Sequence, residues 1–231
     1  MKFLIKKPPK LSQKNLEEFF IMNNLELLVK LSKKKKPLVN EMNVDEPFVP
    51  ELDDLYNLYK YVLMNKRITV LEFGSGWSTL MFSLALKKLR DEYSDKVKSL
   101  RRNNPFELFV VENEKKYLKI TKDRIKKFNK LLKIKNPIKI NYFFSEVEMT
   151  LSNNIICTQY KKLPTCNPDF IYLDGPGLFN VKGDVNGIST RHKDMMPMVS
   201  DILKFEYVYT PGTIIVIDGR AANAIFLKNN F

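Results

Sequence analysis

The sequence predicts a three-layer α/β fold built on a mainly parallel β-sheet. Short runs rich in β-branched and aromatic residues alternate along the chain with longer segments of helical spacing. Strands separated by helices pair in parallel, through right-handed crossovers that place helices on the faces of the sheet. The five expected strands are residues 68–73, 106–111, 138–144, 170–173 and 213–217.

Helices are expected before and between these strands. Ser12 can cap a helix over 12–32, where apolar side chains recur every three or four positions. The other expected helices are 51–65, 78–100, 114–132, 189–205 and one that starts at Ala221. Residues 145–168 are expected to be mostly irregular, and 175–188 to form a Gly-rich loop. The Pro-containing loop 37–50 separates an N-terminal helical arm, residues 1–50, from the main domain, residues 51–231.

The composition narrows the class of protein. A chain of 231 residues with 44% hydrophobic and 28% charged residues fits one globular domain with an appendage. It contains no apolar run long enough for a membrane span, and the apolar run near its N-terminus is too short for a secretory signal. Two cysteines, Cys157 and Cys166, and a single histidine exclude a disulfide framework and a Cys/His zinc site. We therefore expect a cytoplasmic protein.

The formal net charge of +13 is unevenly distributed. Residues 87–139 hold eighteen basic and seven acidic side chains, and residues 1–40 hold ten lysines and three glutamates. Lysine outnumbers arginine 32 to 7, whereas nucleic-acid readers usually depend on arginine for bidentate contacts. We interpret the excess as a solvated lysine-rich surface, with a nucleic-acid face as the less favoured alternative.

Each expected strand ends in, or is closely followed by, a carboxylate. These residues are Glu72, Glu112, Glu146, Asp174 and Asp218. The carboxyl ends of parallel strands share one edge of the sheet, and ligands bind there near the point where the strand order reverses. A random distribution of acids would rarely give this pattern, so we predict a functional site at that edge.

A glycine turn, Gly74-Ser75-Gly76, directly follows the first strand. Glycine permits a tight turn and a close approach of the backbone to a ligand. The third glycine of a dinucleotide-binding motif is replaced by Thr79, and the lysine of a P-loop is absent. Glu72 beside the turn would repel a phosphate and suits a ligand that carries an ammonium group.

Four segments follow one another along the chain: VLEFGSGWSTL, VVEN, DFIYLDGP and GTIIVIDG. Together they resemble the class I S-adenosylmethionine-dependent methyltransferases over about residues 50–227. The resemblance implies a Rossmann-like, doubly wound sheet and S-adenosyl-L-methionine as the cofactor. Two departures stand out. The family's sixth and seventh strands are missing before Phe231, and 38 residues separate Gly74 from Glu112, where dinucleotide folds have about 20.

The resemblance also assigns cofactor contacts. It implies that the turn binds the methionine part, that Glu112 binds the ribose hydroxyls, and that the residues after the third strand touch adenine. The expected cofactor-binding residues are Glu72, Gly74, Ser75, Gly76, Trp77, Ser78, Glu112, Ser145 and Glu146. A carboxylate can accept hydrogen bonds from both vicinal ribose hydroxyls. Trp77 either offers its ring to a cation or packs against the following helix.

On the acceptor side, Asp174, His192 and Asp218 are the catalytic candidates. His192 has a suitable free pKa for a base, although an exposed histidine at a helix start is the alternative. Arg220 and Asn223, one helical turn apart, are expected either to bind an anionic or sugar-like substrate or to cap a helix. Gly219 stands where metal-dependent family members have a second ligand, so a divalent metal is not expected.

The sequence therefore predicts an S-adenosylmethionine-dependent methyltransferase that O-methylates a small-molecule or carbohydrate-like acceptor. One alternative is an RNA methyltransferase that uses the lysine-rich arm. Another is a non-catalytic Rossmann-like protein that binds a nucleoside. The acceptor atom, the oligomeric state and the completeness of the chain at Phe231 stay open.

Overall fold

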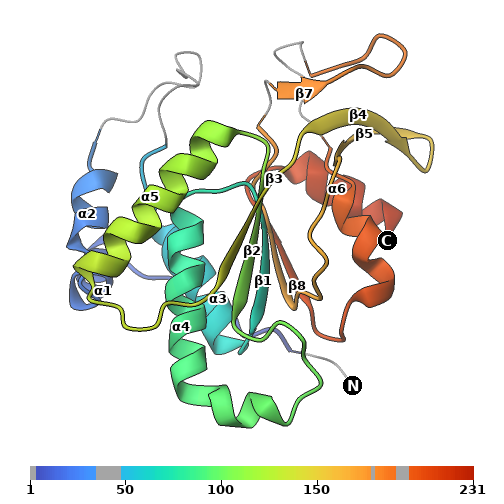
Figure 1. The fold of residues 1–231 in the computed structure, drawn as a ribbon. Helices are drawn as coiled ribbons and strands as arrows, with labels where there is room; N and C mark the ends of the chain where they lie inside the picture. The colour runs from blue at the N-terminus through green and yellow to red at the C-terminus, as the bar shows by residue number, and fades with distance from the viewer. Residues whose placement is uncertain (1–3, 35–47, 178–179, 191–197) are drawn as a thin grey trace.

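The structure is a computed structural model that describes residues 4–34, 48–177, 180–190 and 198–231. Its centre is a five-stranded parallel sheet in the order β3-β2-β1-β6-β8 (Figure 1). The strands are β1 (Thr69–Phe73), β2 (Glu107–Glu112), β3 (Ile140–Phe144), β6 (Phe170–Leu173) and β8 (Ile214–Ile217). The order runs outward from β1 in both directions, so the sheet is doubly wound and reverses between β1 and β6. The predicted fold class is confirmed.

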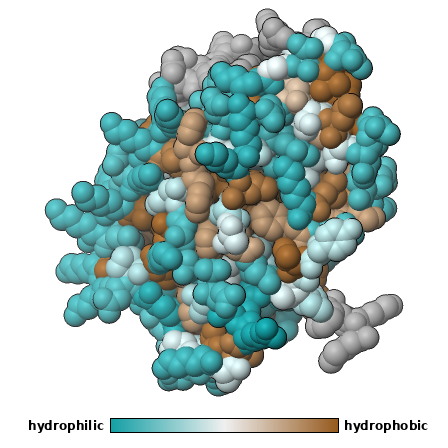
Figure 2. Space-filling model, turned by 45° about the vertical axis from the view of Figure 1, so that its right-hand side comes forward, coloured by the Kyte–Doolittle hydropathy of each residue, from teal (hydrophilic) through white to brown (hydrophobic). Residues whose placement is uncertain are grey.

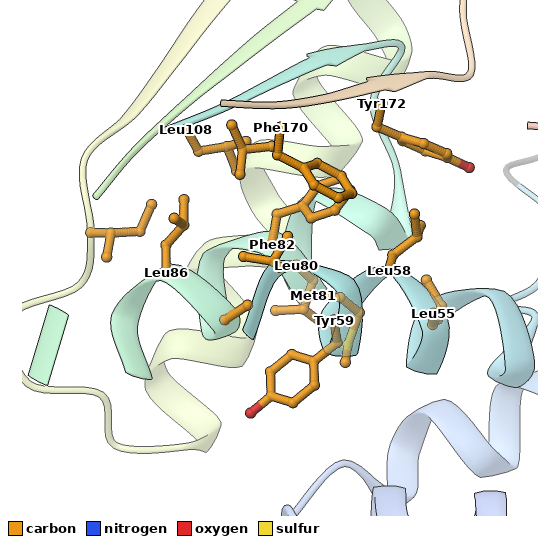
Figure 3. Packing of buried hydrophobic residues seen from close by; sticks show 14 of the residues in the cluster. Leu55, Leu58, Tyr59, Leu80, Met81, Phe82, Leu86, Leu108, Phe170 and Tyr172 are labelled. Atoms are coloured by element: carbon orange, nitrogen blue, oxygen red, sulfur yellow. The ribbon is translucent and has the colours of Figure 1, made fainter. Parts of the chain in front are cut away.

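Three helices, α3 (Leu52–Met64), α4 (Trp77–Lys98) and α5 (Lys115–Leu131), cover one face of the sheet (Figure 1). Successive strand residues point to opposite faces, so every second side chain meets these helices. Figure 3 shows this packing, with Phe82 of α4 lying beside Phe170 of β6. The strand residues buried on this face are Val70, Leu108, Val110, Phe170, Tyr172 and Ile214.

The opposite face is covered by different elements. Leu71, Phe73 and Val111 pack there against a β-hairpin, the 3₁₀ helix η3 (Asp201–Val208) and α6 (Ala221–Asn230). Figure 2 turns this side toward the viewer and shows apolar residues among the mainly hydrophilic residues of the surface. The exposed apolar residues of the hairpin and α6 include Leu151, Ile155 and Ile225.

The predicted single helix over 12–32 is wrong, because the structure divides it into α1 (Gln13–Met22) and α2 (Glu26–Ser32). Asn24 adopts a positive φ of 57°, and the Leu25 amide donates to the Phe20 carbonyl oxygen, which ends α1. The Ser12 cap is confirmed: its Oγ accepts from the Asn15 amide at 3.3 Å. Both helices contribute buried residues to the cluster under α3 and α4.

The expectation of irregular structure over 145–168 is also wrong. β4 (Val147–Ser152) and β5 (Ile155–Tyr160) form an antiparallel hairpin, and the two-residue β7 (Val181–Lys182), inside the expected 175–188 loop, extends it. Asn153 and Asn154, with φ of 49° and 61°, form its two-residue turn. Two successive positive φ angles are the conformation that a tight hairpin with right-handed twist requires.

The described residues between 189 and 205 do not form the expected helix. Residues 191–197, which include His192, lie outside them. Val199 forms a parallel bridge to Thr158, and the chain then enters η3, which is a 3₁₀ helix. Among the described residues, none of the helices combines the length and the apolarity needed to cross a membrane.

Candidate active site

The glycine turn after β1 is tightly packed against the turn after β6. Gly74 has φ +97°, and a Cβ placed on it would lie 3.0 Å from the Gly175 amide nitrogen. A Cβ on Gly175 would in turn lie 2.6 Å from the Tyr160 hydroxyl. Gly76 differs, because its φ is −179° and a Cβ there would meet nothing closer than Ser78 Oγ at 3.9 Å. Open space therefore adjoins Gly76, while Gly74 serves loop packing.

Glu72 lies beneath this turn and holds it in place. Its carboxylate is fully buried and accepts hydrogen bonds from Ser78 Oγ and from Thr79 Oγ1, the latter at 2.7 Å. Thr79 Oγ1 also accepts from the Gly76 amide at 3.1 Å, which links Glu72 to the backbone of the turn. Burial raises the pKa of Glu72 to about 8. Glu72 and Ser78 thus bond to each other within the protein.

Glu112 closes β2 beside the same turn and is 4% exposed. Ser75 Oγ donates to its Oε2 at 2.7 Å, and the Glu114 amide donates to its Oε1 at 2.9 Å. Each carboxylate oxygen can accept more than one hydrogen bond, so both retain acceptor capacity. Burial raises the pKa of Glu112 to about 7, in spite of these two donors. The structure thus brings together Ser75 and Glu112, two of the residues expected to bind the cofactor.

Asp174 and Asp218 close the adjacent strands β6 and β8. Leu173 pairs with Ile217, and the Asp218 amide donates to the Leu173 carbonyl oxygen at 3.0 Å. Burial raises the pKa of Asp174 to about 7, aided by the charge of Asp218 and a hydrogen bond between the two side chains. The structure thus places these two catalytic candidates side by side.

A third acid, on another element, lies close enough to Asp218 for the two charges to interact. Burial, followed by the charges of Asp53, Glu51 and Asp218, raises the pKa of Asp54 to about 6. Asp54 lies in the first turn of α3, which precedes the sheet in sequence. Asp54 was not among the residues expected at the site, although the acidic start of α3 indicated it.

Arg220 and Asn223 bind neighbouring loops. Arg220 Nη2 donates to the Asp174 carbonyl oxygen at 2.9 Å and to the Pro176 carbonyl oxygen at 3.2 Å. Its Nη1 is buried without a partner among the described residues. Asn223 is fully buried, and its Oδ1 accepts from the Val199 amide at 3.0 Å. The Arg220 side chain therefore borders the site, whereas the Asn223 side chain faces the interior.

Trp77 packs within the protein. Its indole nitrogen donates to the Phe48 carbonyl oxygen at 3.0 Å, and its ring lies edge-on to Phe128 of α5. The Arg124 guanidinium carbon lies 3.4 Å from the ring centroid and so occupies one face. Of the two expected roles of Trp77, these contacts favour packing within the protein over a cation–π contact with a ligand.

The residues after β3 point in different directions. Ser145 is 3% exposed, and its Oγ accepts from the Lys162 amide at 2.9 Å. The Glu146 side chain turns to the surface of the hairpin and pairs with Lys161 at 3.0 Å. Ser145 thus stays with the strand ends, while Glu146 does not join the other carboxylates.

Two further residues at this edge were not foreseen. Asn113 Oδ1 accepts from the Gly177 amide at 3.1 Å, and its Nδ2 is buried without a partner among the described residues. The Tyr160 hydroxyl is likewise buried and unpartnered within the described chain, next to Gly175. Buried donors of this kind usually have partners, so they mark places where a ligand or a water completes the structure.

Comparison with known proteins finds similarity at the level of structure. No protein-family model matches the chain, and no curated protein matches it. The chain is similar to the crystal structure of an O-methyltransferase from Bacillus cereus in complex with SAH, at 16% sequence identity and a TM-score of 0.37. The match covers 94% of this chain and 72% of the other.

Proposed function

We propose that this protein is an S-adenosylmethionine-dependent methyltransferase that O-methylates a small-molecule or carbohydrate-like acceptor. The observation that carries the proposal is the contact between Ser75 of the glycine turn and Glu112 at the end of β2. It lies at the carboxyl edge of a doubly wound sheet, next to the reversal of strand order, where such folds bind nucleotides.

The residues at this edge fit that cofactor. Glu112 has acceptor capacity left for two ribose hydroxyls, and the space beside Gly76 is open to a ligand. The unpartnered Asn113 Nδ2 is a donor close to the same place. The carboxylates of Asp174 and Asp218 would offset the positive charge of a sulfonium or an ammonium group. S-adenosylmethionine, when bound, supplies a methyl group activated for in-line displacement.

The Asp174–Asp218 pair suits proton removal from an acceptor hydroxyl. Burial, aided by the neighbouring Asp218, raises the pKa of Asp174 to about 7, so this carboxyl holds its proton to higher pH than a free aspartate does. Above that pH the pair carries a second negative charge and can accept a proton. His192 remains a second candidate base, and Arg220 a candidate for the acceptor's polar groups. Two free cysteines suit a cytoplasmic setting, which we include in the proposal.

Calorimetric titration with S-adenosylhomocysteine, the product of methyl transfer, tests the proposal. We expect saturable binding with one site per chain. We expect no binding of NAD, because the chain lacks the third glycine of the motif that binds the pyrophosphate of a dinucleotide. Binding of NAD but not S-adenosylhomocysteine would overturn the proposal. Binding of S-adenosylhomocysteine without methyl transfer to any hydroxylated acceptor would favour a non-catalytic nucleoside-binding protein.

A further inference from the structure

A row of lysines runs the length of α5 on its outer side. It comprises Lys115, Lys119, Lys122, Lys126 and Lys130, all exposed, and we call it the basic stripe. Residues three or four apart lie on one face of an α-helix, so these five side chains form a nearly straight line. At 1.5 Å per residue the line is about 22 Å long, with a positive charge about every 6 Å.

The positive charge of the stripe is not neutralised by its neighbours. Between residues 115 and 139 there are ten lysines and one arginine, and Asp123 is the single acid. Elsewhere in the fold lysines do pair, as Lys33 does with Glu17 and Lys139 with Glu107. Within the described part of the chain, no ion pair joins Lys119, Lys126 or Lys130 to a carboxylate. The stripe therefore offers its field to an anionic partner.

Aromatic rings of the edge strand β3 lie beside the N-terminal half of the basic stripe. Lys115 Nζ lies 4.8 Å from the centroid of the Phe144 ring, and Lys122 Nζ lies 5.1 Å from that of Tyr142. Phe144 is 40% exposed, so part of its ring is open to a flat ligand. A line of lysines beside an exposed aromatic ring is a combination that binds single-stranded nucleic acids, by phosphate contacts and base stacking.

The helix holds this surface rigidly. The side of α5 opposite the stripe buries Leu118, Ile125 and Phe128 against the sheet. Because the apolar face is used in this way, α5 has none to insert into a lipid bilayer, which an interfacial helix needs. A line of charge also fits an extended polymer better than it fits a flat surface. These features favour a nucleic-acid strand over an anionic membrane.

We propose that the basic stripe, with Tyr142 and Phe144, binds single-stranded nucleic acid, either RNA or DNA. The stripe starts at Lys115, three residues beyond Glu112, so a bound strand would extend to the rim of the candidate active site. The carboxylates of that edge repel phosphate and would keep the strand on α5. This inference goes beyond the proposed methyl transfer and does not depend on it.

Salt-dependent binding tests the stripe. The probes are fluorescent oligouridylate and oligothymidylate of about 12 nucleotides, a length within the usual site size. Five phosphate contacts predict a slope of about −3.5 in log affinity against log salt, or about a 100-fold loss from about 50 to about 200 mM salt. Equal binding of both probes indicates recognition of phosphate and base alone, and preference for RNA adds recognition of the 2′-hydroxyl. Both results support the proposal.

A triple variant, Lys119→Gln/Lys122→Gln/Lys126→Gln, removes the centre of the stripe. We expect a slope of about −1.4 and an affinity at least about tenfold lower at low salt. The matched control, Lys30→Gln/Lys162→Gln/Lys228→Gln, makes the same change in net charge at exposed lysines on other elements. Its slope should stay near the wild-type value. Equal loss in both variants would show a general charge effect and overturn the proposal.

Phe144→Leu tests the aromatic part, with Tyr207→Leu, a 97% exposed residue, as the control. Loss of stacking should lower the affinity about fivefold or more and leave the salt slope unchanged. Phe144→Leu binding like the control would overturn the role of the ring. Binding to phosphatidylserine vesicles without binding to either oligonucleotide would overturn the proposal as a whole. Circular dichroism confirms that each variant is folded.

Discussion

The buried carboxyl groups at the sheet edge differ in their hydrogen-bond partners. Glu72 is bound by two hydroxyl groups of the following helix, whereas Glu112 accepts one hydrogen bond from a hydroxyl group of the glycine turn and one from a backbone amide. Asp174 is bonded to a second acid, Asp218. Residue type alone does not distinguish these three environments. Their partners do: Glu72 holds the turn, while the proposed function assigns Glu112 to cofactor binding and Asp174 to proton transfer.

Removal of the Glu112 carboxylate should weaken cofactor binding. We expect Glu112→Ala to lower the affinity for S-adenosylhomocysteine by about 1.5–3 kcal/mol, the usual cost of lost charged hydrogen bonds. Glu107→Ala, at the other end of the same strand, is the matched control and should bind normally. Calorimetry measures both. Unchanged affinity in Glu112→Ala would move the ribose contact elsewhere, with Glu114 as the first candidate.

Asp174→Asn should lower turnover more than cofactor affinity, because amide nitrogen cannot accept the proton. We expect kcat to fall about 100-fold or more, within the usual range for a lost general base. In the wild type, activity should rise as pH passes about 7, where Asp174 loses its proton. A variant with full activity and an unchanged pH profile would contradict this role.

The two glycines of the turn should respond differently to alanine. Gly74→Ala should destabilise the fold by about 1–2 kcal/mol, because φ is +97° and the Cβ would press on the Gly175 backbone. Gly76→Ala should leave the melting temperature unchanged, since its φ is −179° and the space is open. It should nevertheless weaken cofactor binding if the ligand fills that space. Normal binding by Gly76→Ala would place the cofactor elsewhere.

At the scale of elements, buried strands are predicted best, because such a strand is recognisable from its own residues. β1, β2 and β6 are buried along almost their whole length and β8 is an apolar run at the edge of the sheet, and all four lie within one residue of their expected positions. The hairpin was missed because β4 and β5 are half exposed and their turn contains no glycine. Asp54 and Tyr160 were not assigned to the site, since only tertiary packing brings α3 and β5 to the strand ends, whereas Asn113 directly follows β2 and could have been included.

The hairpin turn should depend on its asparagines. Asparagine tolerates positive φ far better than a β-branched residue does. Asn154→Val should therefore lower the free energy of unfolding by about 1–2 kcal/mol, whereas Asn154→Gly, at a φ of 61°, should keep it or raise it slightly. Denaturant unfolding of both variants measures this. Equal stability of the two would mean that the turn does not hold the register of the hairpin.

At the scale of the whole molecule, charge is divided between two surfaces. The outer side of α5 is strongly basic, while the carboxyl edge of the sheet gathers acids whose pKa values lie well above their usual range. Burial is the first cause in each case, because desolvation disfavours the ionised form. The proposed nucleic-acid strand and the proposed cofactor would therefore bind to different surfaces, and we do not expect them to compete.

The buried acids should make the protein less stable as pH rises. The folded pKa of Glu72 is about 8, above its usual value of 4.5, so between these values the folded state binds a proton that the unfolded state has lost. The stabilising contribution is complete below about pH 4.5 and is lost as pH rises towards 8. The expected loss is up to about 1.4 kcal/mol per pH unit for one such group. Denaturant unfolding at about pH 5 and about pH 8 measures it.

Glu72→Gln isolates this contribution, because glutamine resembles the protonated acid and can still bond to Ser78 and Thr79. The variant should be nearly as stable as the wild type at about pH 5 and more stable at about pH 8, with a shallower slope between them. Glu107→Gln, at an exposed ion pair with Lys139, should keep the wild-type slope. A Glu72→Gln slope equal to that of the wild type would mean that Glu72 stays ionised in the folded protein across this range.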